Sequence, residues 1–145
     1  MLHVSSSTHR CVTLKTALIA PVTPAGYLRL RRNAAGVSVA DAAKVIAPNN
    51  RAEGVALIRL LETDGAAARY VETIHALRDA YPVDADVYLQ LRDGPAATHP
   101  RICAGCGCSH WDPCVAPDDV GTCTFADEKT CTRCSGVAFP RTVYQ

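Results

Sequence analysis

Apolar residues recur at intervals of three and four through the middle of the chain, which is the spacing of one face of an α-helix. Five such segments, separated by a few polar, Gly or Pro residues, predict a mainly α domain over residues 23–94. The first helix is expected to start after Thr23, because Thr is a good N-cap and Pro24 suits a first turn. It should run to about Ala35, where Gly36 ends it.

The next two predicted helices are short and rich in small residues. Ser38 opens a capping box before a helix over 39–47. This helix is built from small residues, with Val39, Ala42, Ala43 and Ile46 on its inward stripe, and therefore allows another helix to pack closely. Asn50 caps a third helix over 51–61, in which the apolar residues again recur at helical spacing.

The last two predicted helices are bounded by proline and glycine. The fourth extends over 70–81, and Pro82 stops it. Asp84 caps a fifth helix that ends at Gly94. Residues 95–100 then form a short linker, whereas residues 1–22 have no sustained period and are expected to be a disordered leader.

The segment after the linker has a different chemistry. Seven of the eight cysteines lie between residues 103 and 134, and the outer four form two CxxC pairs: Cys103, Cys106, Cys131 and Cys134. Two CxxC turns can supply four thiolates to one tetrahedral metal ion. A segment this short, with few aliphatic side chains, cannot bury enough surface to fold unaided. We therefore predict a metal-stabilised, Cys-rich module over 101–136, followed by a tail over 137–145.

The same segment contains further candidate ligands of a second or looser site, namely Cys108, Cys114, Cys123 and His110. Zn²⁺ is favoured as the cofactor because paired CxxC turns flanking a short segment are its usual arrangement. An iron–sulfur cluster is the alternative, since it also uses four thiolates and tolerates irregular spacing. Trp111 is expected to cover the metal-binding loop.

Disulfides rank below metal ligation in this interpretation. The cluster holds an odd number of cysteines, the eighth, Cys11, lies in the leader, and no signal peptide is apparent. No window approaches the ~20 apolar residues of a membrane span. We therefore expect a cytoplasmic protein with no membrane contact.

The net charge of +1 conceals an uneven distribution. From Ala25 to Arg59 there are six Lys/Arg against two acids, whereas from Leu60 to Gly94 there are three against seven. A basic first half of this kind is what a nucleic-acid footprint requires, although ordinary solvated helix faces would look similar.

Two stretches of the helical region resemble a known family. Residues 28–43 comprise a Leu/Arg-rich helix, then Gly36-Val37-Ser38, then an Ala-containing helix, as in helix-turn-helix domains of the Cro and phage-repressor (XRE) type. Residues 58–65 resemble that family's hydrophobe-x-x-hydrophobe-Glu-x-Gly ending of the recognition-helix region, and 74–84 resemble its closing helix. The Cys-rich segment is similar to short Cys-rich tails of phage and prophage proteins.

The resemblance implies a DNA-binding transcription regulator of mobile-element origin. The spacing between Ile46 and Glu62 is longer than usual in the family, and Gly54 lies inside the expected recognition helix, where glycine costs about 1 kcal/mol relative to alanine. The candidate DNA contacts are three arginines for phosphates, two residues near the second helix and four around the third. They are Arg29, Arg31 and Arg32; Ser38 and Lys44; and Asn49, Asn50, Arg51 and Arg59.

Catalysis is not expected. Every cysteine of the cluster lies at ligand spacing, and the sequence contains no Gly-x-Ser-x-Gly, P-loop or dinucleotide motif. Double-stranded DNA is the expected partner, with a homodimer and a protein bound through the Cys-rich module as further candidates. Two other functions remain open: a protein-interaction adaptor that no longer reads DNA, and a redox-responsive regulator with an iron–sulfur cluster.

Overall fold

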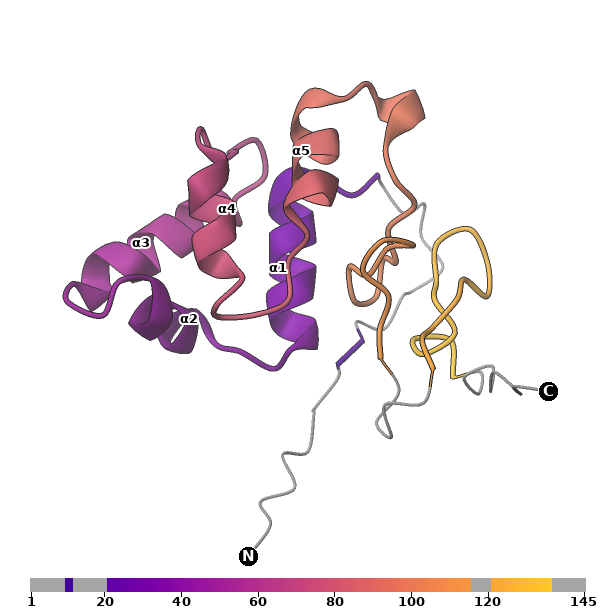
Figure 1. The fold of residues 1–145 in the computed structure, drawn as a ribbon, viewed down its shortest axis with the longest axis horizontal. Helices are drawn as coiled ribbons and strands as arrows, with labels where there is room; N and C mark the ends of the chain where they lie inside the picture. The colour runs from indigo at the N-terminus through magenta and orange to yellow at the C-terminus, as the bar shows by residue number, and fades with distance from the viewer. Residues whose placement is uncertain (1–9, 12–20, 116–120, 137–145) are drawn as a thin grey trace, which may run out of the picture.

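The computed structural model describes residues 10–11, 21–115 and 121–136, and these ranges form a mainly helical structure (Figure 1). Five α-helices are followed by a 3₁₀ turn and a Cys-rich region that contains isolated β-bridges. The elements are α1 Pro24–Ala34, α2 Val39–Ile46, α3 Arg51–Leu61, α4 Val71–Leu77, α5 Ala85–Asp93 and η1 Ala96–Thr98. The predicted fold class is confirmed: a helical bundle precedes a small region of clustered cysteines that could bind metal.

Four of the five helices begin where the sequence predicts a cap. The side chains of Thr23, Ser38, Asn50 and Asp84 each accept a hydrogen bond from the backbone N–H three residues later. Each bond satisfies one of the N–H groups that have no partner within the first helical turn. The sequence pattern therefore places these four helix starts correctly.

The fourth helix is shorter than predicted, because α4 ends at Leu77 rather than Tyr81. The next three amides bond to carbonyls three residues back, which tightens the backbone into a turn of 3₁₀ type. This turn buries Tyr81 in the core, whereas Tyr70, at the other end of the predicted helix, is 60% exposed. The aromatic residues at both ends matched the helical period, but only one of them is a core residue.

One hydrophobic core joins all five helices and extends into the Cys-rich region. Its largest fully buried members are Tyr27, Leu28, Ile58, Ile74, Leu77, Val87 and Tyr88. Ile102, beyond the predicted linker, belongs to the same core. Residues 95–100 therefore connect the helices to a Cys-rich region that packs against the same core. Across the described ranges, no helix is long and apolar enough to cross a membrane.

Helices α2 and α3 lie against each other through small residues. A Cβ atom at Gly54 would lie 3.0 Å from the Cβ of Ala47 and 3.1 Å from that of Ala43. Glycine at this position therefore permits the close approach of the two helices, which offsets its low helix propensity. The sequence predicted close packing on the alanine stripe of α2, and Gly54 supplies the matching surface on α3.

We expect Gly54→Val to destabilise the protein by about 1–3 kcal/mol, because the added side chain must push α3 away from α2. Ala56→Val is the matched control, since Ala56 is exposed on the same helix and should lose no more than about 0.7 kcal/mol. Urea unfolding followed by circular dichroism measures both changes. Equal effects of the two variants would contradict this account of the packing.

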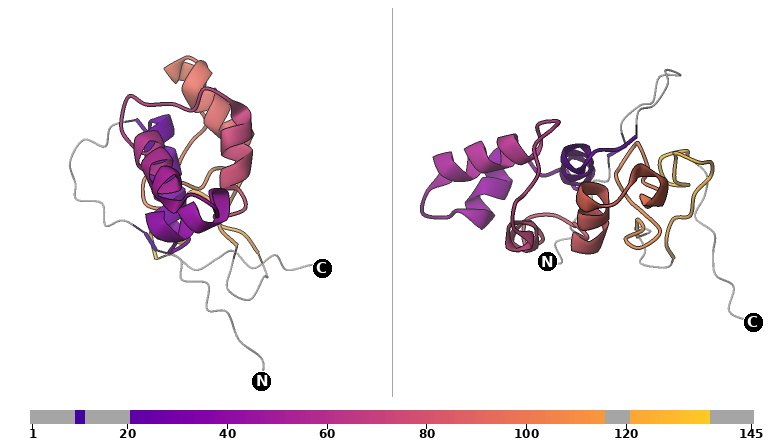
Figure 2. Two further views of the ribbon diagram at one scale, coloured as in Figure 1. Left: turned by 90° about the vertical axis from the view of Figure 1, so that its left-hand side faces the viewer. Right: turned by 90° about the horizontal axis from the view of Figure 1, so that it is seen from above.

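Helix α1 lies between helices α2, α3 and α4 and the Cys-rich region. Figures 1 and 2 show α2, α3 and α4 on one side of α1 and the Cys-rich region on the other. Ala34, near the end of α1, is buried within the cysteine cluster, and Leu28, on the same helix, belongs to the helical core. A single helix is thus shared by both packed regions.

Candidate functional site

The first three cysteines of the cluster are held in one tight turn. The backbone N–H of Cys103 donates to the carbonyl of Cys108 at 2.8 Å, and that of Gly107 donates to the carbonyl of Cys103 at 2.8 Å. Gly107 has a φ of 77°, which L-residues with a side chain rarely adopt. A Cβ there would also lie 2.9 Å from the Cβ of Leu30 on α1. Glycine thus lets this turn form and lie directly on α1.

Two further turns bring the other cysteines to the same place. The N–H of Cys123 donates to the carbonyl of Cys114 at 2.9 Å, next to the bridge between Val115 and Thr122. Cys131 forms a bridge with Phe125. Six cysteine side chains therefore converge from three short loops, and all six are buried: Cys103, Cys106, Cys108, Cys114, Cys123 and Cys131.

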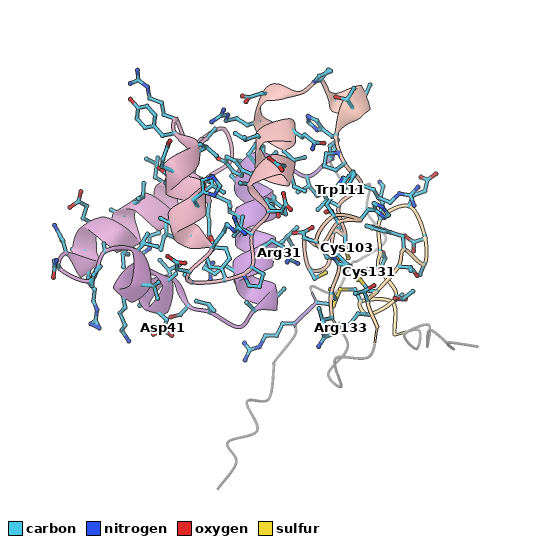
Figure 3. The ribbon with its side chains drawn as sticks, in the orientation of Figure 1. Arg31, Asp41, Cys103, Trp111, Cys131 and Arg133 are labelled. Atoms are coloured by element: carbon cyan, nitrogen blue, oxygen red, sulfur yellow. A yellow bond between two sulfur atoms is a disulfide. The ribbon has the colours of Figure 1, made fainter. Side chains whose placement is uncertain are left out.

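The six sulfur atoms form two groups of four that share two members. Within each group, all sulfur atoms lie within 4.8 Å of one another, and either group could hold a metal ion. The groups are Cys103, Cys106, Cys108 and Cys131, and Cys108, Cys114, Cys123 and Cys131. The sulfur atoms of Cys106 and Cys114 are 3.5 Å apart, and those of Cys108 and Cys123 are 3.7 Å apart. Figure 3 shows the cluster, with Cys103 and Cys131 labelled.

The thiols perturb one another strongly. Hydrogen bonds from Cys106 and then Cys108 lower the pKa of Cys103 to about 6. The pKa of Cys106 is raised, chiefly by its hydrogen bond to Cys103. A thiolate is stabilised by the S–H groups that donate to it, whereas each donor is held protonated. Several of these sulfurs can therefore be thiolates together only beside a positive charge, which a metal ion would supply.

The structure differs from the predicted ligand set at one position. Cys103, Cys106 and Cys131 lie together as predicted, but their fourth partner is Cys108. Cys134 is instead bonded to Cys11 through a disulfide. The sequence favoured reduced cysteines throughout, and this pair departs from that expectation because residues 123 positions apart meet in the fold. Cys11 is one of four described residues of the predicted disordered leader, which are residues 10–11 and 21–22. The leader touches the folded chain at other points too, since the N–H of Arg10 donates to the carbonyl of Ala34 and Val22 packs against the helical core.

His110 and Trp111 lie away from the sulfur atoms. His110 is exposed and belongs to neither four-residue group, so the structure gives it no place among the candidate ligands. Trp111 is 68% exposed and contacts His110 edge to face. The expectation that Trp111 covers the metal-binding loop is wrong, because the loop packs on α1 through Gly107 and leaves the indole outside.

Asp112 is the structural residue that the sequence analysis missed. Its carboxylate accepts hydrogen bonds from the Tyr27 hydroxyl at 2.9 Å, from the Ser109 N–H at 2.9 Å and from the Ser109 hydroxyl. It also pairs with the Arg31 guanidinium at 3.5 Å. Figure 3 shows Arg31 on the side of α1 that faces the Cys-rich region. Ser109 and Asp112, three residues apart, were the available signal of a locally hydrogen-bonded turn.

The three arginines predicted to contact phosphates all make contacts within the protein, although the side chain of Arg29 is also exposed. Arg29 donates to the carbonyl of Glu62 at 2.8 Å. Arg32 makes two hydrogen bonds to the Glu62 carboxylate, at 2.6 and 2.8 Å. Arg31 is buried, and besides pairing with Asp112 it donates to the carbonyl of Pro82. Arg31 and Arg32 are thus engaged in contacts of α1 with its neighbours, whereas Arg29 remains exposed.

The remaining candidate DNA-binding residues lie on α2, on α3 and in the turn that joins them. Ser38 and Asn50 cap these helices, and Lys44 pairs with Asp41 at 3.0 Å. Three others, Asn49, Arg51 and Arg59, are exposed. The structure thus places these candidates on α2, on α3 and in the turn between them.

Comparison of the chain with protein-family models, with curated proteins and with solved structures found no match.

Proposed function

We propose that the chain is a DNA-binding regulator that presents α2 and α3 to double-stranded DNA. The observation that carries this proposal is the α2–turn–α3 unit. Gly54 lets the two helices pack closely, while the turn and the start of α3 stay exposed. A rigidly held helix with an exposed N-terminal end is the element that enters the major groove in helix-turn-helix proteins. The family resemblance drawn from the sequence also supports the proposal.

The proposed contacts are fewer than the sequence suggested. Arg51 and Arg59 on α3 would contact phosphates or base edges, and Asn49 lies in the turn before them. Lys44 could join them, because its ion pair with Asp41 is exposed and such pairs contribute little in water. Arg29 and Arg32 would instead hold α1 against the end of α3 through Glu62. Arg31 would hold α1 to Pro82 and Asp112.

Zinc is the metal that we propose for the Cys-rich region. A tetrahedron of thiolates with Zn–S bonds of about 2.3 Å has edges of roughly 3.8 Å. The sulfurs of Cys106 and Cys131 are 3.8 Å apart, which matches such an edge. An iron–sulfur cluster places iron and sulfide atoms between its thiolates, so it needs more space than sulfur atoms in mutual contact leave.

The test is DNA binding measured by fluorescence anisotropy across a salt series, with a randomised duplex pool. Affinity should fall steeply with salt, because bound phosphates release counterions. Arg51→Ala together with Arg59→Ala should lower the slope of log K against log salt by about 2. Arg78→Ala, which removes an exposed arginine after the end of α4, should leave the slope unchanged. Lack of binding at low salt would overturn the proposal.

A second candidate function, a protein-interaction adaptor, is favoured by the apolar side chains on the same two helices. Val45 is 47% exposed, Leu57 38% and Leu60 60%. Exposed aliphatic residues that share a surface are typical of protein contacts rather than of phosphate binding. Failure of the DNA test would make this adaptor function the preferred one.

A further inference from the structure

We infer that the six buried thiols form a single dinuclear metal centre, in which Cys108 and Cys131 each bridge two metal ions. The first ion would be completed by Cys103 and Cys106, and the second by Cys114 and Cys123. This inference concerns the metal centre alone and does not depend on DNA binding by α2 and α3. It replaces the single four-cysteine site, with a looser second site, that the sequence predicts.

The number of ligands is the first argument. Each of two Zn²⁺ ions prefers four thiolates, so two separate sites would need eight cysteines. The chain has eight, but Cys11 and Cys134 are bonded to each other. Six thiols can complete two four-coordinate sites only if two of them are shared.

The positions of the sulfur atoms identify the shared pair. Cys108 and Cys131 are the two residues that belong to both four-sulfur groups. Terminal ligands of different ions also approach closely, because Cys106 and Cys114 are 3.5 Å apart. The two four-sulfur groups therefore adjoin each other and do not form sites at separate places.

Backbone donors around the cluster suit thiolate sulfur. The N–H of Cys131 donates to the sulfur of Cys103 at 3.3 Å, and the N–H of Cys114 donates to that of Cys123 at 3.0 Å. Hydrogen bonds of this kind stabilise the charged form of a ligand. Sharing two thiolates also reduces the buried negative charge, because six thiolates rather than eight surround two divalent cations.

The alternative arrangements leave some buried cysteines without a role as metal ligands. One ion in the first group leaves Cys114 and Cys123 buried as thiols in contact with a metal-bound sulfur. A site made from Cys103, Cys106, Cys131 and Cys134 requires the disulfide to be reduced, and it leaves Cys108 among the ligands without a role. The dinuclear centre uses every buried thiol once as a terminal ligand or twice as a bridge.

The stoichiometry of the full-length protein tests the inference. Native mass spectrometry of the zinc-loaded chain should show two Zn²⁺ per chain. A cadmium-loaded sample should give two cadmium NMR signals coupled to each other through the bridging sulfurs. This coupling is measured on the unaltered sequence, so it does not depend on whether any variant folds. One metal per chain, or two signals without coupling, would overturn the inference, as would iron with sulfide.

Cysteine variants provide the second measurement. Cys108→Ser should reduce the metal content from two ions to none or one weakly bound ion, whereas Cys123→Ser should retain one ion, held by the first group. The matched control is Cys11→Ser with Cys134→Ser, which removes the two disulfide-bonded cysteines and none of the six buried thiols, and should retain both ions. Loss of an ion from this control would show that eight cysteines form separate sites, and would overturn the inference.

Discussion

Replacing Arg32 with alanine is expected to lower the free energy of unfolding by about 3–5 kcal/mol, because it leaves a buried carboxylate without its partner. The side chains of Arg32 and Glu62 are only 11% and 8% exposed. The guanidinium makes two parallel hydrogen bonds to the carboxylate, which is the geometry in which arginine pairs best. The pKa of Arg32 is raised, first by its hydrogen bond to Glu62, as expected for a stabilised cation.

A double variant distinguishes the cost of an unpaired charge from the cost of losing the side chains themselves. Arg32→Met combined with Glu62→Leu removes both charges and should recover most of the loss, since apolar residues of similar size often replace a buried ion pair without penalty. Lys44→Ala is the matched control, because it breaks an exposed pair with Asp41 and should cost less than about 1 kcal/mol. Chemical denaturation measures all three. A loss from Arg32→Ala no greater than that from Lys44→Ala would contradict the assignment.

Replacing Asp112 with alanine should destabilise the helical domain and the Cys-rich module together, by about 3–5 kcal/mol. The change leaves the Arg31 guanidinium, 9% exposed, without its carboxylate. It also removes the acceptor of the Tyr27 hydroxyl. Burial, and then the negative charge of Asp112, raise the pKa of Tyr27, so this hydroxyl stays protonated and keeps donating at neutral pH.

Thermal unfolding of Asp112→Ala, followed by circular dichroism, should show a lower midpoint for the helices although the substituted residue lies outside them. Asp112→Asn is the matched control, because it keeps the size and one acceptor oxygen while it loses the charge and the second acceptor, so its effect should be smaller than that of Asp112→Ala. Removal of metal by a chelator should lower the helical midpoint in the same way, because Ala34 and Gly107 pack α1 against the cysteine turns. Helices that unfold unchanged in both experiments would show that the two regions are independent.

Four helix starts of this protein could be predicted from neighbouring residues alone. Thr23, Ser38, Asn50 and Asp84 cap helices because their short polar side chains reach the next turn of their own backbone, so neighbouring residues suffice to predict the bond. The buried cysteines were also predicted as metal ligands from their type and spacing. Local signals failed at Tyr81, where the tertiary core rather than the helical period decided the backbone.

The contacts between residues far apart in the sequence could not be predicted, because they depend on how the chain packs. Arg31 looked like a phosphate ligand because charge along a sequence does not reveal burial, and its partner Asp112 lies far along the chain. Cys134 looked like a metal ligand because it forms a CxxC pair with Cys131, which is visible in the local sequence. Its disulfide to Cys11, and the position of Cys108 among the buried sulfurs, depend on how distant loops pack. The two partners of each contact meet only when the helices and the cysteine loops pack against α1. No short window of the sequence contains both partners.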